Sequence, residues 1–164
     1  MSITTGFHRV RAETIKMLEA EPELMDWLLG YSHCAAIGEK LGCCGAVMPP
    51  QLDIDQAWDE ILLLLAGTDH HEAYQSLHIS LWEDYDGYEE IRLFSPEVVR
   101  KGLAALEKLE PDELRREALR RDLRTYGGDP VQYLLDDTLA HLERLREFWR
   151  EAARAGEGII SETG

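Results

Sequence analysis

The chain has 164 residues, of which 45% are hydrophobic, and a formal net charge of −15 at pH 7. This length fits one domain with an ordinary core, and the charge opposes binding to nucleic acid or anionic membranes, because both attract basic residues. Three cysteines, an odd number, argue against a disulfide framework, and no apolar run approaches the roughly 20 residues that span a bilayer.

The N-terminal third is predicted to contain short elements followed by an irregular segment. Residues 5–10 (TGFHRV) partly alternate in polarity, which is typical of a strand, and a helix is expected over about 12–20. Pro22 suits the first turn of a second helix, and Gly30 is its expected end. Residues 31–50 contain glycines, a cysteine pair and a proline pair, so they predict a loop or an irregular crossover.

A capped amphipathic helix is predicted over residues 54–66. Asp53 stands at the expected N-cap, Gln56 follows three residues later as in a capping box, and Gly67 ends the pattern. One buried face is expected from four apolar residues at i, i+3, i+4 and i+7: Trp58, Ile61, Leu62 and Leu65.

The middle of the chain mixes weak and strong signals. Residues 73–82 are compatible with a short helix, whereas 83–90 (EDYDGYEE) have the composition of a solvated loop. Residues 90–94 (EIRLF) alternate as a strand does. Residues 95–97 (SPE) then provide an N-cap, a first-turn proline and an acid for the positive helix end. A further helix is expected over 111–123.

The last long helix is expected from Val131 onward and has the clearest periodicity of the chain. A seven-residue repeat is compatible with a coiled coil, but three further apolar residues widen the stripe and favour a core helix. Gly156 is its expected end, and residues 158–160 can form a closing strand. The repeat consists of Val131, Leu135, Thr138, Leu142, Leu145, Trp149 and Ala152, and the stripe is widened by Leu134, Leu139 and Phe148.

Together these elements predict a helix-rich α+β domain with a small sheet. Four stretches resemble the YfbM-like family, catalogued as domain of unknown function 1877. The resemblance implies one compact α+β domain over 1–164 with variable inserts at about 31–50 and 68–88, and it implies no activity. The family's Tyr-Pro pair is replaced here by Thr-Tyr-Gly-Gly at 125–128. The stretches are GFHRVRAETIKMLEAEPELMDWLL, LDIDQAWDEILLLLAGT, IRLFSPEVVRKGLAALEKLEPDEL and YLLDDTLAHLERLREFWREAARAGEGII.

The two inserts contain the residue types of a zinc site, but not its usual spacing. No Cys-x2-Cys pair is present, and two adjacent cysteines rarely bind one ion without strain. Buried cysteines and loop histidines explain the same residues, and a cysteine nucleophile with a histidine base is a further reading. The candidate ligands are His33, Cys34, Cys43, Cys44, His70 and His71.

No catalytic residue and no cofactor is predicted. The chain has no P-loop, no dinucleotide-binding glycine motif and no nucleophile elbow.

The acidic charge is concentrated in the N-terminal half. Residues 1–90 contain 17 acidic and 4 basic residues, whereas residues 91–164 contain 15 acidic and 13 basic residues. Aromatic side chains among acids are typical of contact surfaces, so one segment of this half is the predicted binding surface. It consists of Trp82, Glu83, Asp84, Tyr85, Asp86, Tyr88, Glu89 and Glu90.

Two functional hypotheses follow from these features. The first is a non-enzymatic cytoplasmic protein that binds a basic protein partner through its acidic surface, with an inhibitor or immunity protein as a special case. The second is a small enzyme or metal-binding protein built on the cysteines and histidines of the inserts. A cytoplasmic location is expected because residues 1–13 lack the apolar stretch of a signal peptide. The sequence gives no indication of the oligomeric state.

Overall fold

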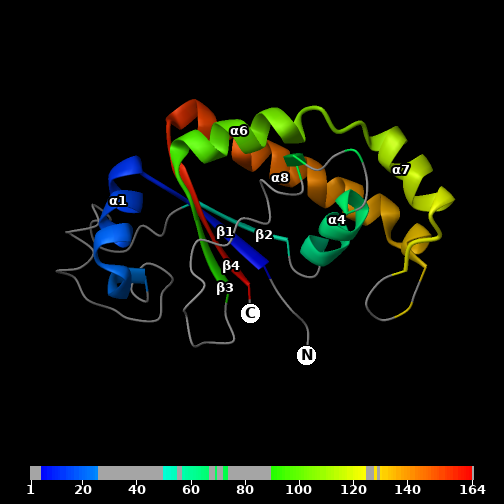
Figure 1. Ribbon diagram of the computed structural model, residues 1–164, viewed down its shortest axis with the longest axis horizontal. Helices are drawn as coiled ribbons and strands as arrows, with labels where there is room; N and C mark the ends of the chain where they lie inside the picture. The colour runs from blue at the N-terminus through cyan, green and yellow to red at the C-terminus, as the bar shows by residue number, and fades with distance from the viewer. Residues whose placement is uncertain are drawn as a thin grey trace.

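In the residues that it describes, a computed structural model of the chain has four strands in one sheet and several helices around it (Figure 1). It describes residues 5–25, 50–54, 57–66, 69, 72–73, 90–124, 128 and 130–163. The strands are β1 (Thr5–Val10), β2 (Gln51–Asp53), β3 (Glu90–Phe94) and β4 (Gly158–Thr163). The α-helices are α1 (Ala12–Ala20), α4 (Ala57–Leu65), α6 (Pro96–Leu106), α7 (Pro111–Arg120) and α8 (Leu135–Ala155). Two 3-10 helices complete the set, η1 (Pro22–Leu24) and η2 (Val131–Tyr133).

The four strands form one antiparallel sheet in the order β2-β1-β4-β3. The last strand in the sequence, β4, therefore lies between β1 and β3. Phe7 lies opposite Ser161, and Ser161 lies opposite Arg92, so these three residues form one row across three strands. Because side chains alternate along a strand, this register determines which residues share a face of the sheet.

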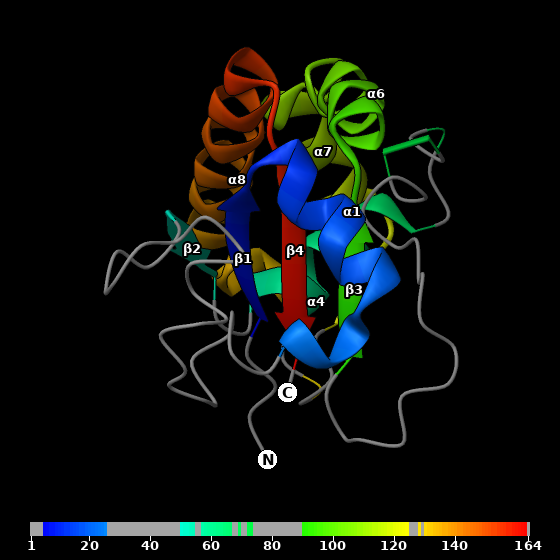
Figure 2. The same cartoon turned by 90° about the vertical axis from the view of Figure 1, so that its left-hand side faces the viewer.

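Each face of the sheet is covered by helices. Phe7, Phe94 and Ile159 are on one face and join a large buried cluster with α4, α6 and α8. Val10 and Ile160 are on the other face and pack with α1 and η1 in a second cluster. Figure 2 shows α1 in front of the sheet, with α6 and α8 on its far side. The helix-rich α+β class with a small sheet is thus confirmed, with a core on both sides of the sheet.

Helix α8 is a core helix, as the widened stripe indicates. Six of the seven residues of the predicted repeat are buried in α8, and Phe148 is buried beside them. The ring of Trp149 contacts that of Phe94 edge to face, with 5.1 Å between ring centroids. Gly102 of α6 permits this close packing, because a Cβ atom at this position would overlap the Trp149 ring. The buried members of the repeat are Leu135, Thr138, Leu142, Leu145, Trp149 and Ala152.

Two helix ends match their sequence signals. The Ser95 hydroxyl accepts a hydrogen bond from the Val98 amide at 3.3 Å, and Pro96 is the first residue of α6. A serine N-cap contributes about 1 kcal/mol to stability. Gly156 ends α8 in the left-handed region at φ 67°, where glycine avoids the strain of a Cβ atom. These ends fix where α6 and α8 meet the strands β3 and β4.

The predicted N-cap at Asp53 is wrong. Asp53 belongs to strand β2 and pairs with Gly6, and Ile54 after it is not helical. The physical reason is that burial alternates from one residue to the next here, as in a strand. Leu52 and Ile54 are buried, while Asp53 between them is exposed. Two-residue alternation places these residues at a sheet edge, and the helix α4 starts later, at Ala57.

Other expected elements differ in their bounds. Of the helix expected after Pro22, the described part is the 3-10 helix η1 and the helical residue Met25, and residues 26–30 lie outside the described residues. The last long helix starts at Leu135 rather than Val131, because Val131–Tyr133 forms the 3-10 helix η2. The buried face of α4 includes Ile61 and Leu65, as predicted. None of the helices in the described ranges is long and apolar enough to cross a membrane.

Candidate functional site

Almost all residues of the predicted binding surface lie outside the described ranges. Residues 82–89 are among them, and Glu90 is described only as the first residue of β3, where its backbone pairs with Thr163. The six candidate metal ligands, His33, Cys34, Cys43, Cys44, His70 and His71, also lie outside the described ranges. Within those ranges, no three His, Cys, Asp or Glu side chains are grouped closely enough to hold a metal ion.

A histidine and a carboxylate pair inside the sheet. His8 of β1 is only 3% exposed, and its Nε2 atom lies 2.9 Å from Oε1 of Glu162 on β4. Gly6 makes room for this carboxylate, since a Cβ atom at Gly6 would lie 3.3 Å from the same oxygen. The second ring nitrogen, Nδ1, is buried and has no hydrogen-bond partner within the described part of the chain. The pair therefore joins β1 to β4 through their side chains, on the face of the sheet that packs against α1.

The face of the sheet that packs against α6 and α8 also has buried polar residues. Arg92 of β3 is 3% exposed and lies directly opposite Ser161 of β4, which is also buried. A guanidinium group is rarely buried unless it is paired, so this position is not explained by packing alone.

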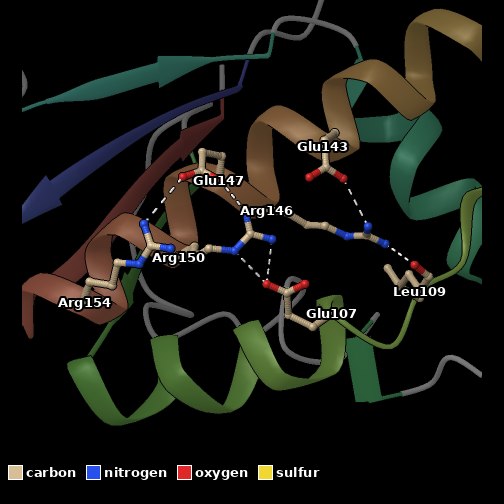
Figure 3. A network of polar contacts seen from close by, with 7 residues as sticks. All are labelled: Glu107, Leu109, Glu143, Arg146, Glu147, Arg150 and Arg154. Carbon is tan, nitrogen blue, oxygen red and sulfur yellow. Dashed lines mark hydrogen bonds and ion pairs between the residues drawn. The ribbon is translucent and has the colours of Figure 1, made fainter.

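The described basic residues of α8 are engaged in contacts within the molecule (Figure 3). Arg146 is buried and donates through Nη2 to the carbonyl oxygen of Leu109, between α6 and α7. Its Nη1 donates to Glu143 at 3.1 Å, whereas its Nε atom has no partner in the described ranges. Arg146 therefore joins α8 to the α6–α7 connection.

Arg150 forms a second contact between the same helices. It donates to Glu107 at the end of α6 at 2.8 Å, and also to Glu147 one turn earlier on α8. The hydrogen bonds to Glu107 and then to Glu147 raise the pKa of the Arg150 guanidinium above its ordinary value. The network consists of matched acids and bases and leaves little net charge on this side.

Three exposed acids of α1 and η1, unlike the acids of the α8 network, have no basic partner in the described ranges. Glu13, Glu19 and Glu23 are exposed, and none forms an ion pair with a residue in the described ranges. On α7, by contrast, Arg120 binds Glu117 in the same turn, and their hydrogen bond lowers the pKa of the Glu117 carboxyl. We call Glu13, Glu19 and Glu23 the α1 acidic face. The exposed Lys16 lies one turn from both Glu13 and Glu19, so this surface contains three acids and one base that are open to a partner.

Sequence reasoning missed the buried polar residues, although some left a signal. His8 alternates with Gly6 and Val10, which marks an inward position in a strand. Arg146 lies four residues after Leu142 and three before Trp149, so it falls on the apolar stripe of α8. In both cases a polar residue at a core position was the available clue.

Comparisons with known proteins found a matching family model and a similar solved structure. The model of one family, described as domain of unknown function (DUF1877), matches residues 1–161. The crystal structure of YfbM from Escherichia coli, a protein of unknown function, is similar with a TM-score of 0.67 and 18% sequence identity. The similarity covers 98% of this chain and 99% of that chain. At this identity the likeness concerns the fold, and no curated protein matches the chain.

Proposed function

Since this chain belongs to the family described as domain of unknown function (DUF1877), as its sequence resemblance indicates, we propose a function from its own charges. The family description names no activity. We propose that the protein is a non-enzymatic cytoplasmic binding protein whose acidic N-terminal half contacts a basic protein partner. An inhibitor or immunity protein that masks a basic surface is a special case of this proposal.

The observation that supports the proposal is the separation of paired from unpaired charges. Most described bases of the C-terminal half are engaged within the molecule, as Arg146 and Arg150 are on α8, whereas Arg100 and Arg116 form no ion pair with described residues. The acids of the α1 acidic face have no such partners in the described ranges. Exposed charges that are not neutralised internally produce a field that attracts a partner of opposite sign. They also repel nucleic acid and anionic membranes.

Solubility alone is the simpler explanation of an acidic surface. It predicts that exposed acids of both halves contribute equally, which the control variant below tests. No observation on the described residues favours the alternative of a small enzyme or metal-binding protein, because its residues lie outside them.

The test neutralises the α1 acidic face without changing shape. A triple variant, Glu13→Gln, Glu19→Gln and Glu23→Gln, is compared with the native protein for the proteins it retains from its own cells, quantified by mass spectrometry. We expect specific basic proteins to be lost from the variant and to be released from the native protein at about 1 M salt, where screening acts over about 3 Å.

A matched control removes the same number of exposed acids elsewhere. Glu110→Gln, Glu113→Gln and Asp137→Asn lie on the C-terminal half, and these acids are also exposed and form no ion pair with described residues. This control is expected to retain the partners of the native protein. If the α1 variant retained every partner that the native protein retains, the proposed role of this acidic face would be wrong. Equal losses from both variants would mean that total charge, not this surface, governs retention.

A further inference from the structure

We draw no further inference here: the strongest candidate, the side-chain cluster of His8, Glu162 and Asp53 around Gly6 on the α1 face of the sheet, belongs to the β1–β4 contact already described, because the Glu162 carboxylate occupies the space that Gly6 leaves and no described group in it marks a ligand.

Discussion

Replacing Arg146 by alanine should destabilise the fold substantially, although the change removes a charge from the interior. Arg146 is 7% exposed, and its guanidinium binds a backbone carbonyl, that of Leu109, in the connection from α6 to α7. That carbonyl would remain buried without its donor in the alanine variant. The variant therefore tests whether this contact holds α8 to the α6–α7 connection.

Three contributions determine the expected magnitude. A hydrogen bond from a charged donor contributes about 1.5–3 kcal/mol, and the buried aliphatic stem contributes about 0.8 kcal/mol for each methylene. The ion pair with Glu143 adds at most about 1 kcal/mol, because the Glu143 side chain is 57% exposed. Removing a buried guanidinium with an unpartnered Nε atom offsets part of this loss. The net expectation is about 3 kcal/mol.

Urea unfolding with linear extrapolation measures this difference directly. Arg146→Met separates packing from hydrogen bonding, because methionine retains an unbranched stem and removes the donor. We expect it to lose about 1–2 kcal/mol, which is the cost of the unpaired carbonyl alone. Arg154→Ala is the matched control on the same helix, and its exposed side chain predicts a change within about 0.5 kcal/mol.

The reasoning would be refuted by a loss below about 1 kcal/mol in Arg146→Ala, since an unpaired buried carbonyl alone costs that much. It would also be refuted if the methionine variant were more stable than the native protein. In that case burial of the charge would cost more than its hydrogen bonds return, as occurs in some buried ion pairs.

Three further predictions concern packing, the sheet and acid stability. Gly102→Ala places a methyl group on the ring of Trp149 and should cost about 1–3 kcal/mol, so an unchanged melting temperature would contradict the close approach of α6 and α8. A double-mutant cycle of His8→Ala and Glu162→Ala should give a coupling of about 1 kcal/mol, and additive effects would show that the pair is not formed. The pKa of the Glu117 carboxyl is lowered in the folded state by a hydrogen bond from the neighbouring arginine, so its contribution is complete above the unfolded pKa and is lost as pH falls through the folded one. Glu117→Gln should therefore reduce the loss of stability in acid, measured by unfolding at a series of pH values, and identical acid profiles would oppose this assignment.

Local signals in the sequence predicted local structure well. Ser95 and Gly156 mark helix ends whose partners lie within a few residues, so their geometry follows from their immediate neighbours. The stripe of α8 is similarly local, because a helix repeats every 3.6 residues wherever it packs. These helix ends and this buried stripe could therefore be predicted without knowing how the strands pair.

Features that depend on distant partners were not predictable in the same way. Asp53 has the residue type and spacing of an N-cap, but its pairing with Gly6 places it in a strand instead. Nothing near His8 in the sequence indicates Glu162, which lies 154 residues away. All of the predicted binding surface except Glu90, and the metal candidates at 33–44 and 70–71, lie outside the described residues, so they stay predictions.

The central position of β4 has a consequence for the order in which the chain can fold. Strand β1 is bordered by β2 and β4, and β3 is joined to the sheet through β4. At about 5–20 residues per second, a ribosome needs roughly 8–30 s to add the residues between His8 and Glu162. Once β3 has been synthesised it has no neighbour in this sheet until β4 follows, and β1 lacks its β4 neighbour for the whole interval. The sheet must therefore close late, and an emerging chain is most exposed to aggregation or to chaperones just before β4 appears.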